Sequence, residues 1–219
     1  RNDGNAGTGG YKTTATFVKP NLFRELDRLI SSFEVHNDSD PEVGAIVAST
    51  SYSWPLANQT RLISSYAYGE REYVEHSGSL GEISFKTHHV LGQLEKTISS
   101  STNQAWTAFV GLNINRTDSY LSGVRSDLVA GAGDEGWVRT GHLKAGVNFN
   151  GSHQSKSWTG SIYGMQGINA ISEDFQRADF AEDGIKPGEA RAVGVKGNLA
   201  WTLKPGVGLN VGASGQVAL

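Results

Sequence analysis

Residues 193–217 read VGVKGNLAWTLKPGVGLNVGASGQV, and larger apolar side chains recur at almost every second position of this stretch. A period of two is typical of a β-strand whose two faces lie in different environments. Lys204-Pro205-Gly206 interrupts the pattern, and a Pro-Gly pair between two alternating runs indicates a tight turn. The stretch therefore predicts an antiparallel hairpin with an apolar face that carries Val193, Val195, Leu199, Trp201, Leu203, Val207, Leu209, Val211 and Val217.

The same alternation recurs along most of the chain. It is clear over residues 46–54, 106–115 and 142–149, and it is weaker, with one or two slips, over residues 10–18, 27–36, 61–74, 83–97 and 157–170. Together with 193–203 and 207–217, these stretches predict ten strands. Many are longer than the roughly 5 to 6 residues usual in globular sheets and approach the roughly 9 to 11 residues that cross a membrane.

The composition narrows the functional classes. Glycine supplies 28 of the 219 residues and charged residues only 19%, which favours one domain of many strands and turns over a helical enzyme. The net charge of −3 provides no basic field to hold nucleic acid. The chain contains no cysteine, which excludes disulfides, thiolate metal sites and cysteine nucleophiles. No run approaches the roughly 18 apolar residues of a membrane helix, so any membrane would be crossed by strands.

The face opposite the apolar one is unusual for a soluble sheet. It is rich in Gly, Ser, Asn, Thr and Gln and carries little charge, which suits a water-filled channel. We therefore predict an all-β fold, an antiparallel up-and-down transmembrane β-barrel in contact with outer-membrane lipid. Its pore would be lined by Asn113, Asn115, Lys144, Asn148, Lys196, Asn198, Asn210 and Gln216. The alternative from another class is a soluble β-sandwich that serves as an adhesin or binding domain.

The tryptophans favour the membrane interpretation. In a meander of these strands, short connections would share one rim, and Trp54, Trp106, Trp158 and Trp201 each lie at a strand end on that rim. The other rim would carry Tyr11, Tyr120 and Trp137 beside two long connections, near 121–136 and 171–189. Aromatic girdles at both rims, with short turns on one side and long loops on the other, are typical of outer-membrane barrels.

Motifs that could carry chemistry lack the necessary context. Residues 131–136 have the spacing of a dinucleotide fingerprint, but no strand-to-helix pattern surrounds them, and a loop tip is predicted instead. His88 and His89 are adjacent in a predicted strand, so they point to opposite faces and cannot share a metal ion. The acidic pairs fall in loops or at strand ends, where solvated charge is the default. We predict no enzymatic activity, no cofactor and no metal site.

Several short motifs, taken in order, resemble the barrel of the two-partner secretion transporters. Two N-terminal turns and one strand end are similar to family landmarks: Asn2-Asp3-Gly4 with Gly7-Thr8-Gly9, Pro20-Asn21-Leu22 with Asp27-Arg28-Leu29, and Tyr52-Ser53-Trp54-Pro55-Leu56. Residues 88–97, with Leu91, Gly92, Leu94 and Lys96, resemble a later strand of the family. Leu203-Lys204-Pro205 through Gly215-Gln216 is similar to the hairpin that precedes the family's inward-folded loop.

This resemblance implies an outer-membrane barrel of about sixteen strands in a Gram-negative bacterium, related to the barrel-assembly insertases. Residues 1–219 would form a partial barrel domain, from the second to the eleventh strand, without the POTRA domains and the C-terminal strands. The barrel would conduct an unfolded secreted partner, of haemolysin or adhesin type, to the cell surface. A passive porin and a barrel-assembly insertase stay open as alternatives.

Overall fold

A computed structural model describes residues 11–37, 43–73, 82–204 and 206–219. Ten long strands and one short one dominate it: β1 (Tyr11–Pro20), β2 (Arg28–Asn37), β3 (Val43–Pro55), β4 (Thr60–Tyr73), β5 (Ile83–Ser100), β6 (Gln104–Leu121), β7 (Val124–Arg125), β8 (Trp137–His153), β9 (Lys156–Gly167), β10 (Arg191–Lys204) and β11 (Val207–Ala218). One α-helix, α1 (Asp174–Glu182), and two short 3₁₀ turns, Gly133–Glu135 and Asn169–Ile171, lie in the connections.

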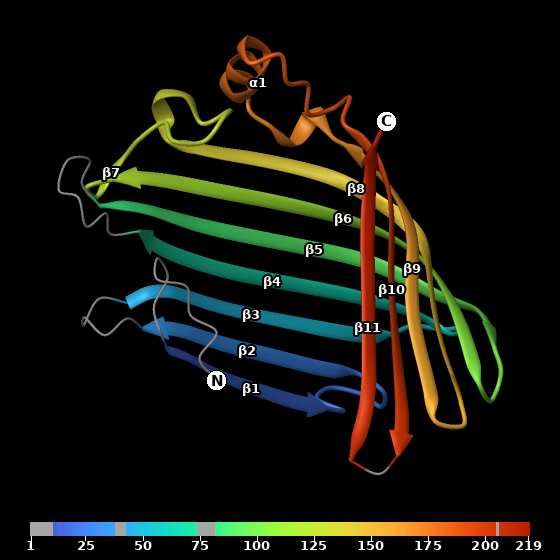
Figure 1. The fold of residues 1–219 in the computed structure, drawn as a ribbon. Helices are drawn as coiled ribbons and strands as arrows, with labels where there is room; N and C mark the ends of the chain where they lie inside the picture. Colours follow the sequence, from blue (N-terminus) through green and yellow to red (C-terminus); the bar gives the residue numbers. More distant parts are fainter. Residues whose placement is uncertain (1–10, 38–42, 74–81, 205) are drawn as a thin grey trace.

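The strands form one antiparallel sheet in which each long strand pairs with its neighbours in sequence. The order runs from β1 through β6 to β8 and on to β11, and β7 adds a two-residue pairing to the end of β6. The sheet bends strongly, so that β10 and β11 run across the direction of β1–β5 in Figure 1. The all-β, up-and-down architecture predicted from the sequence is confirmed, as an open part of a barrel with edges at β1 and β11.

The register gives the sheet two chemically different faces. Directly paired residues of neighbouring strands point to the same side of the sheet. One such row crosses the sheet from Trp54 of β3, paired with Leu62 of β4, to Val193 of β10, paired with Val217 of β11. We call the side to which this row points the apolar face. Its large side chains are exposed in the isolated chain: Phe17, Phe33, Trp54, Leu62, Tyr66, Val90, Leu94, Trp106, Val110, Leu143, Ile162, Val193, Val195, Leu199, Trp201, Leu209, Val211 and Val217. The other side is the polar face.

The described residues contain no ordinary hydrophobic core. Their buried apolar side chains are few and mostly small or peripheral: Ala45, Phe109, Ala132, Val138, Phe180 and Ala192. A β-sandwich would instead cover the apolar side of one sheet with a second sheet. A single sheet with an uncovered apolar face therefore contradicts the soluble-sandwich alternative.

The connections divide between two rims as the meander requires. Residues 21–27, 56–59, 101–103, 154–155 and 205–206 join strands at the short-turn rim. The long-loop rim carries residues 122–136 and 168–190, together with two connections that lie largely outside the described residues. The predicted asymmetry between short turns and long loops is thus present in the structure.

The turn between β1 and β2 is organised around a buried carboxylate. Asp27 is only 1% exposed and accepts hydrogen bonds from the amides of Leu22 (2.6 Å), Phe23 (2.9 Å) and Arg24 (3.0 Å). The Tyr52 hydroxyl of β3 donates a fourth hydrogen bond to it, at 2.5 Å. Burial alone would raise the pKa of Asp27, but these four donors lower the pKa to about 2. The carboxylate therefore stays ionised and fixes the turn.

Helix α1 is the main element that the sequence analysis missed, since residues 171–189 were expected to form a plain loop. It follows Ser172-Glu173 and lies above β8 in Figure 1. The Phe180 ring of the helix packs so closely against Gly131 that a Cβ atom at that position would clash with it. Asp179 accepts a hydrogen bond from the Gly131 amide at 2.8 Å. The segment 131–136 thus lies in a loop, as expected, and this loop is docked against α1.

No helix in the part of the chain that the structure describes is both long and apolar enough to span a bilayer.

Candidate translocation face and membrane boundary

The eight predicted pore residues share the polar face. Asn113 and Asn115 lie on β6, Lys144 and Asn148 on β8, Lys196 and Asn198 on β10, and Asn210 and Gln216 on β11. Directly paired residues lie on the same side of the sheet, and Asn148 pairs with Ser161, which in turn pairs with Lys196. Their position on one face follows from the register, while their contact with a water-filled pore stays a prediction.

Lys144 lies near the middle of this face against two aromatic rings. Its ammonium nitrogen is 3.7 Å from the centroid of the Tyr163 ring and 5.9 Å from that of Phe109. A cation over an aromatic face gains electrostatic stabilisation while its stem covers apolar surface. Phe109 and Tyr163 were not among the predicted pore residues, although their positions in the alternating pattern place them on the polar side.

Two ion pairs on the polar face were not foreseen by the sequence analysis. The guanidinium of Arg61 on β4 contacts the carboxylate of Glu95 on β5 at 2.5 Å, and Gln93 donates to the same carboxylate at 2.6 Å. Glu95 is only 4% exposed. Glu34 likewise contacts Lys12 at 2.8 Å. The opposite charges within each of these cross-strand pairs neutralise one another.

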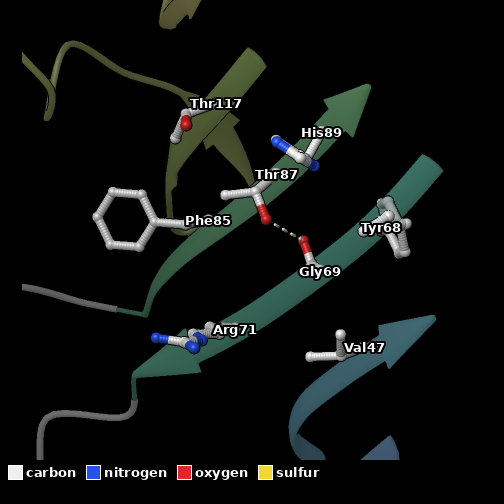
Figure 2. Close-up of a pocket in the computed structure, with 9 residues that line it drawn as sticks. Val47, Tyr68, Gly69, Arg71, Phe85, Thr87, His89 and Thr117 are labelled. Carbon is white, nitrogen blue, oxygen red and sulfur yellow. Dashed lines mark hydrogen bonds between the residues drawn. The ribbon is translucent and has the colours of Figure 1, made fainter. Parts of the chain in front are cut away.

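A hollow of about 450 Å³ opens on the polar face toward the long-loop rim (Figure 2). Residues of four adjacent strands surround it: Val47 of β3; Ala67, Tyr68, Gly69 and Arg71 of β4; Phe85, Thr87 and His89 of β5; and Thr117 of β6. The Thr87 hydroxyl donates to the Gly69 carbonyl at 3.2 Å across its floor. The lining contains no carboxylate to act with His89, so the arrangement offers no acid–base pair.

The two adjacent histidines of β5 do not come together at one site. His88 and His89 lie on opposite faces, where His88 meets the Tyr66 hydroxyl at 2.8 Å and His89 meets the Asn113 side chain at 3.1 Å. Within the described ranges, no group of three or more His, Asp or Glu side chains could hold a metal ion.

The aromatic residues gather at the two rims of the apolar face. Trp54, Trp106, Trp158 and Trp201 all lie on this face near the short-turn rim. Trp106 packs on Phe149 with ring centroids 5.2 Å apart, and the Lys156 ammonium lies 4.6 Å from the Trp201 ring. At the long-loop rim, Tyr120 and Trp137 lie on the same face. Tyr11 begins β1, and its side chain lies outside the described residues.

Comparison with known families identifies this arrangement. The family model of the haemolysin secretion/activation proteins ShlB/FhaC/HecB matches residues 1–203, most of the chain. The chain belongs to this family. The resemblance to two-partner secretion transporters that the sequence motifs suggested is therefore confirmed.

Solved structures share the fold of this family member. The chain is similar to CdiB from Escherichia coli, with a TM-score of 0.77 and 16% identity over 99% of this chain and 39% of that one. It is also similar to CdiB from Acinetobacter baumannii, with a TM-score of 0.72 and 15% identity over 95% of this chain and 35% of that one. The chain thus spans less than half the length of either structure. No curated protein sequence matches it.

The structure joins two of the family-like motifs physically. Asp27 belongs to the motif Asp27-Arg28-Leu29, and Tyr52 begins the motif Tyr52-Ser53-Trp54-Pro55-Leu56. Their 2.5 Å hydrogen bond ties the first short turn to β3, so the two motifs form one local unit. The motif at Asn2–Gly9 lies outside the described residues.

Proposed function

We propose that these residues form part of the transmembrane barrel of an outer-membrane transporter in a Gram-negative bacterium, which conducts an unfolded secreted partner to the cell surface. Family membership supports a secretion role. We infer further that the partner is of haemolysin or adhesin type, and that POTRA domains and the remaining strands of the barrel lie outside residues 1–219. The protein would act as a conduit and not as an enzyme.

The single observation that carries the proposal is the contrast between the two faces of one continuous sheet. Large apolar side chains cover one face between two aromatic rows, while the other face carries Asn, Ser, Thr, Gly and paired charges. A bilayer solvates the first face, and water solvates the second. An unfolded polypeptide finds few strong attachment points on a wall of small polar side chains.

The barrel is tested by refolding the full-length protein in detergent and in lipid bilayers. We expect lipid-dependent folding, seen as heat-modifiable gel mobility, together with single-channel conductance. A folded, detergent-independent monomer without conductance would refute the membrane assignment.

The facing of the pore is tested by single cysteines, because the 219 residues contain none. In the refolded full-length protein, a charged, membrane-impermeant thiol reagent should modify Asn148→Cys and reduce conductance. The matched control is Val147→Cys, the adjacent residue on the apolar face, which should resist the reagent. Equal modification of both positions would contradict the assignment of the faces.

Transport is separated from passive diffusion by a partner-export assay in cells. Deletion of the protein should abolish surface appearance of its secreted partner while uptake of small solutes persists. Loss of solute uptake with normal export would favour the porin alternative.

A further inference from the structure

A compact group of charged side chains lies on the apolar face where the hydrophobic band ends. Val90 of β5 pairs with Ile114 of β6, and the next pair on this face toward the long-loop rim is His88 with Arg116. Lys86 and Asp118 form the pair beyond. With Arg125 of β7 and Tyr120 they line a hollow of about 290 Å³. We call Lys86, His88, Arg116, Asp118, Tyr120 and Arg125 the boundary cluster.

The hairpin between β6 and β7 brings the third cation into this cluster. Ser122 and Gly123 both have positive φ, 48° and 79°, which suits a two-residue turn between antiparallel strands. Tyr120 pairs with Arg125 across this turn. Without the hairpin, the chain would leave the rim at Leu121, and Arg125 would not reach Asp118.

Cations exceed carboxylates in the boundary cluster. Asp118 is only 3% exposed and contacts both Arg116, at 2.8 Å, and Arg125, at 2.9 Å. The Lys86 ammonium contacts Glu70 at 3.0 Å. Within the cluster, three permanent cations therefore face one carboxylate, Asp118, while Glu70 beside it pairs with Lys86. Because each guanidinium has five N–H donors, both arginines keep donors for a further anion.

The side chains of the three cations are held in place and partly exposed. The Arg116 guanidinium lies 4.3 Å from the Trp137 ring centroid, and the Lys86 ammonium lies 5.5 Å from that of Tyr120. Aromatic stacking and a shared carboxylate limit the rotamers of these long side chains, so less entropy is lost when an anion binds. The remaining exposed surface of the cluster faces away from the sheet, on the side of the exposed Val90.

The height of the cluster matches the edge of a bilayer. Trp106 marks the short-turn rim on β6, and Arg116 lies ten residues farther along the same strand. At about 3.4 Å per residue and a tilt of about 40°, the two lie about 25 Å apart along the bilayer normal, which is about the height of the apolar band of such barrels. Arg116 therefore lies at the level of the lipid headgroups.

We propose that the boundary cluster binds the phosphate group of an anionic lipid in the outer leaflet of the membrane. The acyl chains of this lipid would lie against the apolar face below Val90 and Ile114, and its phosphate would accept hydrogen bonds from Arg116, Arg125 and Lys86. The inference rests on the proposed function for the orientation of the barrel, with the long-loop rim outside.

The test measures binding of lipid A to the refolded full-length protein in non-ionic detergent by native mass spectrometry. The variant is Lys86→Gln/Arg125→Gln, which leaves Arg116 to pair with the buried Asp118. The matched control is Lys156→Gln, a cation on the same face that lies over an aromatic ring at the opposite rim. We expect the double variant to weaken lipid A binding at least tenfold and the control to leave it unchanged.

Two further arms identify the ligand chemistry. Dephosphorylated lipid A should bind the wild type and the double variant equally, because only the phosphate contacts the cluster. Inorganic phosphate at 1 mM should leave lipid A bound, because it lacks acyl chains to lie on the apolar face. Displacement by inorganic phosphate would overturn the lipid assignment in favour of a free-anion site.

The proposal is also overturned if the double variant binds lipid A as the wild type does, or if Lys156→Gln weakens binding equally. Should the double variant fail to fold, the single changes Lys86→Gln and Arg125→Gln are each expected to weaken binding. Conductance of the same preparations reports on the proposed function independently: a wild type that binds lipid A at the cluster without forming a channel would refute the transporter and leave the lipid site standing.

Discussion

Replacing Ile162 by arginine should destabilise the protein strongly in a bilayer. Ile162 lies on the apolar face of β9, is 55% exposed in the isolated chain, and pairs with Val147 and Val195. It is four residues from Trp158 of the short-turn rim. Four residues at about 3.4 Å each and a tilt of about 40° give a depth of about 10 Å, close to the midplane of an apolar band about 25 Å tall. An arginine at the midplane costs about 2 to 4 kcal/mol.

The neighbouring position supplies the control at the same depth. Ser161 lies on the polar face beside Lys196 and Asn148, so an arginine there stays in water. Its repulsion from Lys196 is about 1 kcal/mol at most in a water-filled lumen. A second control, Leu203→Arg, lies beyond Trp201 at the rim, where the cost falls to about 0 to 1 kcal/mol.

The assay is equilibrium unfolding of the full-length protein from lipid vesicles in guanidinium chloride, followed by tryptophan fluorescence. We expect Ile162→Arg to lower the free energy of unfolding by about 2 to 4 kcal/mol, and the two controls, Ser161→Arg and Leu203→Arg, to lower it by about 1 kcal/mol or less. Equal losses at Ile162 and Ser161 would refute the assignment of the two faces. A cost at Leu203 as large as at Ile162 would refute the position of the membrane.

Three further predictions concern the two rims. Tyr52→Phe removes the hydroxyl that donates to the Asp27 carboxylate and should lower the free energy of unfolding by about 1.5 to 3 kcal/mol. The control Tyr66→Phe loses an exposed hydrogen bond to His88 and should lower it by less. Equal losses would contradict the role of Asp27 in fixing the turn. The pKa of Asp27 lies at about 2 instead of its ordinary 3.8, so this carboxylate stabilises the fold above a pH of about 4, and that stabilisation is lost as the pH falls toward 2. The free energy of unfolding of the wild type should therefore fall across this pH window, and Asp27→Asn should remove this fall. An unchanged fall in Asp27→Asn would show that another group titrates. Gln176→Ala leaves two partly buried backbone groups of β8 without their side-chain partner and should cost about 1 to 3 kcal/mol locally. Limited proteolysis should then cut residues 168–190 faster, whereas the exposed Glu182→Ala should behave as the wild type. Identical cleavage of both variants would refute the contact.

The strand order was predictable because the alternation is local and the connections on one rim are short. Residues 193–217 show a clean period of two, and the structure pairs them as the expected hairpin. The structure also has the four rim tryptophans on the apolar face, because period two fixes the side of every residue once one strand is assigned; their contact with a membrane boundary stays a prediction.

The strand ends were not predictable in the same way. The expected strand 106–115 extends in fact to Leu121, and 142–149 begins in fact at Trp137. The reason is physical. Beyond Ile114 the apolar face carries Arg116 and Asp118, so the contrast between the two faces disappears at the level of the boundary cluster. A strand that passes from a bilayer into water keeps its pleat and loses its hydrophobic period.

Helix α1 escaped prediction because tertiary contacts, not periodicity, stabilise it. Its nine residues are mostly polar, and only Gln176 and Phe180 are buried. The local signal is weak: Gln176 accepts a hydrogen bond from the Glu173 amide at 3.1 Å, as a residue of the first helical turn often does. The decisive contacts, with Gly131 and with the backbone of β8, come from residues far away in the sequence.

These contacts connect the helix to the membrane boundary. β9 ends at Gly167 opposite His142, so residues 137–141 of β8 extend past their partner strand. Their backbone groups would cost several kcal/mol each if they faced lipid unpaired. Instead, Gln176 donates to the Trp137 carbonyl at 3.0 Å and accepts from the Arg139 amide at 3.3 Å, and Ser172 donates to the Arg139 carbonyl at 2.9 Å.

The part of β8 that has no partner strand begins at the same height as the boundary cluster. Arg139 pairs with Arg116, and Trp137 pairs with Asp118, so the uncovered part of β8 begins where the apolar face becomes charged. A sheet edge in lipid can be satisfied only by another strand, whereas an edge in water can be satisfied by side chains and a loop. At this height, the side chains of Gln176 and Ser172 take the place of β9 as hydrogen-bond partners of β8. This exchange supports the same boundary that the cations and the aromatic residues mark independently.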